Sequence, residues 1–217
     1  MAEDSCQPKP QSDTFQDGSW ISTHERFLAE SNDKEPEALF FGDSLFAWLR
    51  ETDIYKEQFA PMHSLCFGLF GDSTANLLWR IQNGELNSIK PKVIFVSAGG
   101  CNVGQSAESI RKGIVKVAEA IAGCQPQAQL FVLKLLPRGK GPNKRRELIA
   151  SVNEGLEAAL ADVPKAKILD IDPGFIAADG TIDQHDMLDF VHLSQEGYRK
   201  AFETVSVALT SILQPEL

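Results

Sequence analysis

The sequence predicts a single α/β domain of three layers, in which helices cover both faces of a five-stranded parallel sheet. From residue 38 onward, five short apolar runs alternate with longer segments that carry apolar residues at helical spacing. The runs are almost continuously apolar, which is typical of strands buried on both faces. The 217 residues and the hydrophobic content of 43% suit one globular core, and the chain shows no internal repeat.

The N-terminal region is expected to lie outside this alternation. Residues 1–16 are rich in Ser, Asp, Gln and Pro and are predicted to form a disordered tail. The single domain would then span residues 17–217. Its first helix is predicted over about 20–28, with Ser22 or Thr23 as the cap.

The strands and helices of the sheet follow one another closely. The apolar runs predict strands at residues 38–42, 63–68, 92–98, 129–137 and 166–171. Apolar residues at helical spacing predict helices near residues 45–57, 72–83, 107–123, 143–161 and 195–213. An irregular stretch separates the last strand from the last helix.

Composition and charge argue against several classes of function. The formal net charge of −9 argues against nucleic acid or an anionic membrane surface as the main partner. No apolar stretch approaches the length of a transmembrane segment, and the N-terminus does not resemble a signal peptide. The four cysteines show no C-x-x-C spacing, so a reduced, cytoplasmic protein is expected.

No cofactor or metal is expected. A flavodoxin-like cofactor binder is an alternative for this fold class, but no G-x-G-x-x-G follows any predicted strand, and the first strand ends without a glycine-rich phosphate loop. No cluster of His, Cys and Asp has the spacing of metal ligands.

The end of the first strand carries a candidate nucleophile. The apolar run stops at Gly42, and Ser44 lies at the turn into the next helix. A backbone N–H at a helix N-terminus favours developing negative charge. Ser44 could therefore attack an ester carbonyl, and its own amide could stabilise the oxyanion. The alternative is that Asp43 or Ser44 only caps the helix.

A candidate base follows the fifth strand. Parallel strands place their carboxyl ends at one edge of the sheet, so the loops after the strands form one candidate site. Asp189 and His192 are three residues apart, so both side chains can face the same way. The carboxylate could then orient the imidazole and stabilise its cation. The alternative for His192 is an ordinary loop histidine.

The other histidines are ranked behind His192. His24 and His63 are expected to be structural, because the first lies on the N-terminal helix and the second begins a strand at its opposite end. His185, beside Asp186, is the second candidate base.

These motifs resemble those of the GDSL, or SGNH, hydrolase superfamily. The resemblance is carried by the Gly-Asp-Ser-Leu run at 42–45 and by the Asp-Phe-Val-His run at 189–192. The chain is similar in particular to the catalytic alpha subunits of intracellular type Ib platelet-activating factor acetylhydrolase, from Trp20 to the last helix. The stretches that carry this closer likeness are residues 41–44, 78–86, 89–94, 135–139 and 185–193.

The resemblance implies a flavodoxin-like fold and a serine esterase that removes a short acyl group from phospholipids such as platelet-activating factor. Ser44 would be the nucleophile, His192 the base and Asp189 its orienting partner. The oxyanion hole would use the backbone N–H groups of Ser44 and Gly71, with an asparagine side chain as third donor. That asparagine is replaced here by Cys101.

This replacement puts the activity in question. Loss of one oxyanion-hole donor typically costs about 10²–10³ in kcat, and a thiol is a weak donor. Asn102 could substitute if the loop shifts, whereas Cys101 itself is not expected to be a nucleophile. The family's acyl pocket maps to Leu45, Gly100 and Val191, with Gly100 in place of a bulkier residue.

Two hypotheses follow from the resemblance. The first is a working serine esterase with reduced activity on phospholipids or other short-acyl esters. The second is a catalytically impaired subunit that is retained for binding. The family's alpha subunits form homodimers or heterodimers with a related alpha subunit, and they bind the WD40-repeat lissencephaly protein that regulates dynein.

Overall fold

A five-stranded, all-parallel sheet forms the centre of the computed structural model, which describes residues 4–13 and 16–214. The strands occur in the order β2-β1-β3-β4-β5, which is the flavodoxin-like arrangement. Their bounds are β1 Ala38–Gly42, β2 Ser64–Gly68, β3 Val93–Ser97, β4 Gln129–Leu133 and β5 Ala166–Leu169. The α/β fold class predicted from the sequence is thereby confirmed.

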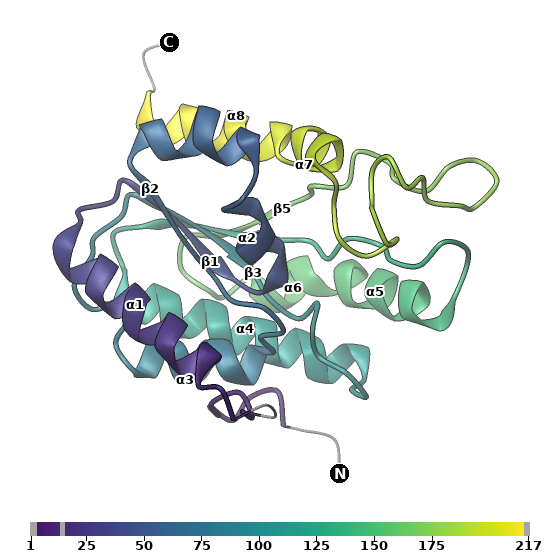
Figure 1. The fold of residues 1–217 in the computed structure, drawn as a ribbon. Coiled ribbons are helices and arrows are strands. Elements are labelled where there is room, and N and C mark those ends of the chain that lie inside the picture. Colours follow the sequence, from purple (N-terminus) through teal and green to yellow (C-terminus); the bar gives the residue numbers. More distant parts are fainter. Residues whose placement is uncertain (1–3, 14–15, 215–217) are drawn as a thin grey trace.

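Helices cover both faces of the sheet (Figure 1). The helices of one layer are α1 Ser19–Asp33, α3 Thr74–Gln82, α4 Ala107–Cys124, α5 Lys144–Glu154 and α6 Leu156–Leu160. The other layer holds α2 Ser44–Leu49, the short helices η1 Tyr55–Phe59 and η2 Ala60–Met62, α7 Gln195–Ala201 and α8 Glu203–Leu213.

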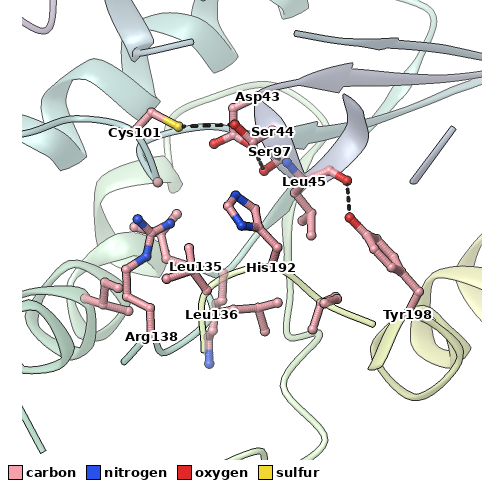
Figure 2. Close-up of a pocket in the computed structure, with 15 residues that line it drawn as sticks. Asp43, Ser44, Leu45, Ser97, Cys101, Leu135, Leu136, Arg138, His192 and Tyr198 are labelled. Carbon is pink, nitrogen blue, oxygen red and sulfur yellow. Dashed lines mark hydrogen bonds between the residues drawn. The ribbon is translucent and has the colours of Figure 1, made fainter. Parts of the chain in front are cut away.

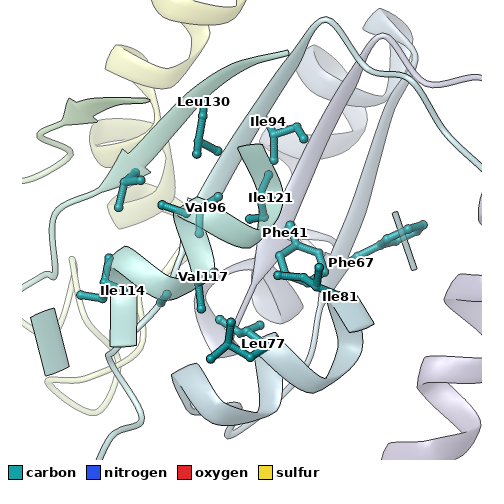
Figure 3. Close-up of a cluster of buried hydrophobic side chains, with 14 of the residues drawn as sticks. Phe41, Phe67, Leu77, Ile81, Ile94, Val96, Ile114, Val117, Ile121 and Leu130 are labelled. Carbon is teal, nitrogen blue, oxygen red and sulfur yellow. The ribbon is translucent and has the colours of Figure 1, made fainter. Parts of the chain in front are cut away.

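Alternate residues of each strand supply the two cores. Phe41 and Val96 point into the core shared with α3 and α4 (Figure 3). Phe40 and Phe95 point to the opposite face, where their rings stack with centroids 5.1 Å apart. Because β1 to β4 are buried on both faces at nearly every position, their sequences are almost continuously apolar, and this is why these strands were predictable.

Three helix predictions differ from the structure. The helix predicted over 143–161 is two helices separated at Gly155, which has the weakest helix propensity of any residue except proline. The last helix likewise divides at Phe202. The helix predicted over 45–57 ends at Leu49, and the π-helix η1 follows after a turn.

The N-terminal region also differs in detail. Helix α1 begins at Ser19. The residue before it, Gly18, has a left-handed conformation with a φ of 67°, and neither Ser22 nor Thr23 caps the helix. Thr23 instead donates its hydroxyl hydrogen to the Ser19 carbonyl at 2.9 Å. The disordered tail predicted over 1–16 stays a prediction; in the structure, Ser5 is buried and accepts a hydrogen bond from the Thr74 hydroxyl at 2.9 Å.

The carboxyl ends of β1, β2 and β3 meet at one edge of the sheet. Gly42, Gly68 and Ser97 are register partners across the three strands, so the chain leaves the sheet at the same level in each. The loops that follow these strands carry Ser44, Gly71 and Cys101, whereas Asp189 and His192 lie in the segment between β5 and α7. Within the described residues, no helix is long and apolar enough to span a membrane.

Candidate active site

Ser44 is the first residue of α2, and Asp43 caps the helix. The Asp43 carboxylate accepts hydrogen bonds from the Leu45 N–H at 3.1 Å and the Ser97 hydroxyl at 2.8 Å. Burial raises the pKa of Asp43, although these hydrogen bonds and the charge of Arg138 oppose the rise. Because Asp43 supplies the cap, the Ser44 hydroxyl is left to face the cavity beside it.

Two glycines allow α2 to start directly above the sheet. A Cβ atom on Gly68 would lie 2.1 Å from the backbone nitrogen of Ala47, inside the helix. A Cβ on Gly42 would lie 2.4 Å from the Ser97 carbonyl oxygen. Both contacts are impossible, so glycine at these two strand ends is what brings Ser44 against the loops after β2 and β3.

The Gly71 backbone N–H donates a hydrogen bond to the Ser44 Oγ at 2.9 Å. Gly71 has a φ of 76°, a conformation that favours glycine and turns its N–H toward Ser44. The structure therefore brings together Ser44, the candidate nucleophile, and Gly71, the glycine whose N–H the family resemblance places in the oxyanion hole.

Cys101 also faces the candidate nucleophile. Its Sγ lies 3.7 Å from the Ser44 Oγ (Figure 2). Burial raises the pKa of the Cys101 thiol to about 11, with the nearby Asp43 charge adding to the effect. The group is therefore a neutral thiol at neutral pH, which makes it a weak hydrogen-bond donor and a poor nucleophile.

Asn102 does not face Ser44, so the suggested substitution for the missing donor is not supported. Its side-chain NH₂ group donates to the Thr74 Oγ1 at 2.9 Å and to the Gln105 Oε1 at 3.0 Å. Its Oδ1 accepts from the Thr74 N–H at 3.1 Å. With its amide fully used and the residue buried, Asn102 anchors the loop to the start of α3 instead.

His192 and Asp189 form the expected pair. The His192 Nδ1 lies 2.7 Å from the Asp189 Oδ2. A tight turn creates this geometry, because Phe190 adopts a φ of 61° and Met187 bridges to Leu193. Slight burial disfavours the Asp189 anion, but hydrogen bonds from the backbone and ring of His192 outweigh it and lower the pKa of Asp189 to about 2.

A cavity of about 210 Å³ brings the separate parts together, with Ser44 and His192 both in its lining. The three acyl-pocket positions predicted from the sequence, Leu45, Gly100 and Val191, line the same cavity. No hydrogen bond joins Ser44 to His192 among the described contacts. Catalytic hydrogen bonds are often long before substrate binds, so this geometry is compatible with a base acting on Ser44.

The remaining histidines lie outside this cavity. His24 is buried, and its Nδ1 lies 2.6 Å from the Glu85 Oε1. His185 is exposed and pairs with Asp183 at 2.9 Å, whereas its neighbour Asp186 pairs with Lys200 at 2.7 Å. Among the residues that the structure describes, no group of three or more His, Cys, Asp or Glu could hold a metal ion.

Arg80 is a residue that the sequence reasoning missed. Its guanidinium is fully buried and pairs with Asp72 and Glu85, each at 2.7 Å. It also donates to the carbonyl oxygens of Gly42 and Phe67, at 3.1 and 2.7 Å, and so ties together the strand ends that lead to Ser44 and Gly71. The available signal was a single charged residue in an otherwise apolar helix segment at 77–81.

Known proteins share sequence with most of this chain. The model of the GDSL-like lipase/acylhydrolase family matches residues 40–200. Human platelet-activating factor acetylhydrolase IB subunit alpha1 is 47% identical over 206 residues, which cover 95% of this chain and 89% of that protein. The alpha2 subunit from Gallus gallus is 44% identical over 207 residues, covering 95% and 90%.

Solved structures show the same fold at much lower identity. A GDSL-like lipase from Bacteroides thetaiotaomicron is 17% identical and superimposes with a TM-score of 0.66, covering 89% of this chain and 98% of that one. At this identity the likeness shows the fold alone.

Proposed function

Because this chain belongs to the GDSL-like lipase/acylhydrolase family, we propose that it is a serine esterase whose nucleophile is Ser44, whose base is His192 and whose orienting carboxylate is Asp189. The observation that carries the proposal is the shared cavity. In it, a serine hydroxyl that accepts a hydrogen bond from a loop amide lies opposite a histidine whose second nitrogen is bonded to a carboxylate.

The reaction follows the logic of acyl transfer. Asp189 holds the Nδ1–H of His192, which leaves Nε2 free to accept the Ser44 proton as Oγ attacks the ester carbonyl carbon. The tetrahedral intermediate collapses when His192 returns this proton to the leaving alcohol. Water then attacks the acyl-enzyme, again through His192, and releases the carboxylic acid and free Ser44.

The hydrogen-bond donors of the oxyanion hole are expected to determine kcat, because they stabilise the tetrahedral intermediate. The Ser44 and Gly71 N–H groups would donate to the developing oxyanion, and the Cys101 thiol would add a weak third donor. We expect turnover below that of an otherwise equal site with an amide donor at position 101. The reduction should reach about 10²–10³ if the thiol contributes nothing.

The proposed substrates are esters with a short acyl group, and the acetyl ester of a platelet-activating-factor-like phospholipid is the first choice. The names of the 47% identical relatives support this choice. Those relatives are named as subunits, so we propose a homodimer or a heterodimer with a related alpha subunit, acting in the cytoplasm.

Labelling with a fluorophosphonate probe tests the proposal. We expect the purified protein to be labelled at Ser44 and to hydrolyse 4-nitrophenyl acetate, with both signals lost in Ser44→Ala. A matched control is Ser73→Ala, because Ser73 is a buried helix-capping serine that lies outside the Ser44 cavity. A folded protein that is neither labelled nor active would refute the esterase assignment.

A second candidate function is favoured by Cys101. With only a thiol where an amide donor is expected, the chain could serve as a catalytically impaired subunit, retained for dimerisation and for binding the WD40-repeat lissencephaly regulator of dynein. Its test is a pull-down of that partner with wild-type and Ser44→Ala protein. Equal capture by both, together with negligible turnover, would favour this function over the first.

A further inference from the structure

Arg138 lies in the segment between β4 and α5 and lines the same cavity as Ser44 and His192. Figure 2 shows its guanidinium group and the His192 ring both directed into the cavity. The guanidinium donates no hydrogen bond and forms no ion pair with any residue of the described ranges. Its Nε atom is buried and has no hydrogen-bond partner.

This situation is unusual for a buried donor. A buried N–H group without a partner costs free energy comparable to a lost hydrogen bond, and the cost is larger for a charged group. Neighbouring arginines are satisfied: Arg145 donates to the carbonyl oxygens of Gly100 and Asn102, at 2.8 and 2.9 Å. Arg146 donates to the carbonyl oxygen of Gly180 at 2.7 Å. Arg138 alone among these three keeps its donors toward the cavity.

The Asp43 carboxylate lies on the same side of Gly100 as Arg138 but is not its hydrogen-bond partner. The charge of Arg138 lowers the pKa of Asp43, but the two groups form no ion pair. The Asp43 Oδ1 is already engaged by Ser97 and Leu45. The Asp43 Oδ2 also faces Gly100, but it accepts no hydrogen bond from Arg138, so the guanidinium keeps its donors available in the cavity that contains Ser44.

Gly100 keeps the space next to Arg138 open. A Cβ atom on Gly100 would lie 3.6 Å from the Arg138 Nη2 and 3.0 Å from the Asp43 Oδ2. The loop containing Gly100 is fixed by Arg145, so this gap is a stable feature of the site. A small polar group of a substrate can enter where a larger residue would place its side chain.

We propose that Arg138 is a specificity-determining residue that binds an anionic oxygen group, a carboxylate or a phosphate, carried by the ester substrate. The guanidinium fork matches two oxygens of either group and is suited to bidentate binding. The proposal rests on the esterase function proposed above, since it names the substrate class of that same site. The anion has two sources: a carboxylate on the acyl chain, or a phosphate on the alcohol.

Four esters separate the sources. The acyl-side pair is 4-nitrophenyl hemisuccinate and 4-nitrophenyl acetate, and the alcohol-side pair is an acetyl ester of glycerol 3-phosphate and the same ester of glycerol. In Arg138→Met, we expect kcat/KM for one anionic ester, relative to its neutral partner, to fall about 10- to 100-fold, the worth of a hydrogen bond between charged groups. Arg138→Lys should restore part of the loss, because the charge returns without the fork.

Arg199→Met is the matched control, since Arg199 is an exposed arginine paired with Glu57 on the surface. It should leave both ratios unchanged. If Arg138→Met lowers kcat/KM equally for the anionic and neutral esters of both pairs, the residue supports the fold of the site and the proposal is refuted.

Binding to an inactive variant keeps the two proposals apart. Calorimetry would compare the affinity of 4-nitrophenyl hemisuccinate and of the glycerol 3-phosphate ester for Ser44→Ala and for Ser44→Ala/Arg138→Met. A Kd that weakens about 10- to 100-fold for either ligand supports Arg138 even if wild-type protein hydrolyses no ester. Equal affinities for both ligands would overturn the Arg138 assignment, even if Ser44-dependent turnover is found.

Discussion

Replacing Cys101 by Asn should raise kcat, and the reason can be worked from the contacts around Ser44. The Cys101 Sγ lies 3.7 Å from the Ser44 Oγ, the atom to which Gly71 donates its N–H, and Cys101 and Gly71 line the same cavity. A side chain at position 101 can therefore reach an oxygen that develops on a carbonyl bound to Ser44. The neighbouring Asn102 cannot take this role, because its amide is bonded to Thr74 and Gln105.

The size of the gain follows from the strength of the donor. An oxyanion-hole donor is typically worth about 10²–10³ in kcat, or roughly 3–4 kcal/mol. The thiol of Cys101 is neutral because burial raises its pKa to about 11, and a neutral thiol is a weak donor. We therefore expect Cys101→Asn to increase kcat at least about tenfold, with about 10³ as the upper limit.

Space for the larger side chain is available. Cys101 is only half-buried and borders two cavities, of about 210 and 490 Å³. Asparagine adds two heavy atoms to the side chain, and the two cavities leave room for them, so we expect little change in Tm.

The assay is steady-state hydrolysis of 4-nitrophenyl acetate by wild type, Cys101→Asn and Cys101→Ala. Ser44→Ala in each background reports turnover that does not depend on the serine. Cys101→Ala measures how much the thiol contributes, and we expect less than a tenfold loss because the thiol is a weak donor. If Cys101→Asn is folded, shows Ser44-dependent turnover and is no faster than wild type, position 101 is not part of the oxyanion hole.

Three further predictions follow from the structure. Asp189→Asn should lower kcat on the order of 10⁴-fold, because the imidazole loses the carboxylate that fixes its tautomer, and an unchanged kcat would remove Asp189 from the mechanism. Arg80→Met should destabilise the fold by about 3–5 kcal/mol, since it leaves Asp72 and Glu85 as buried carboxylates without their cation, and a Tm within about 2 °C of wild type would contradict this. Because its raised pKa leaves less of the Cys101 thiol as thiolate, iodoacetamide should alkylate Cys101 about 100-fold more slowly at about pH 8 than a thiol with the ordinary pKa of 9.0. Mass spectrometry of the Cys101 peptide measures this rate, and fast alkylation at that pH would refute the raised pKa.

Much of the fold was predictable because the sheet is covered on both faces. Each strand of β1 to β4 is buried at nearly every position, and a continuous apolar run marks such a strand in the sequence. Helix boundaries were less predictable. Apolar spacing continues through the divisions at Gly155 and Phe202, so this pattern alone predicts one long helix in each place.

The candidate site was predictable in part, for a related reason. Ser44 and His192 could be assigned because parallel strands deliver their following loops to the same edge of the sheet. Arg80 and Arg138 could not, since a charged residue in a sequence does not show whether its partners are present. Asn102 shows the same limit from the other side: its sequence position suggested a donor near Ser44, and packing against α3 turned it away.

The sequence by itself determined that this protein is a parallel α/β domain with Ser44 and an Asp189–His192 pair at one edge of its sheet. Local patterns encode these features: a continuous apolar run marks a buried strand, and the three-residue spacing of Asp189 and His192 lets their side chains meet. Only the tertiary structure decided that Asn102 turns away from the serine and that Arg138 keeps its donors toward the cavity. Those outcomes depend on contacts between distant segments, and the energy of a polar group depends on which partners the fold places within reach.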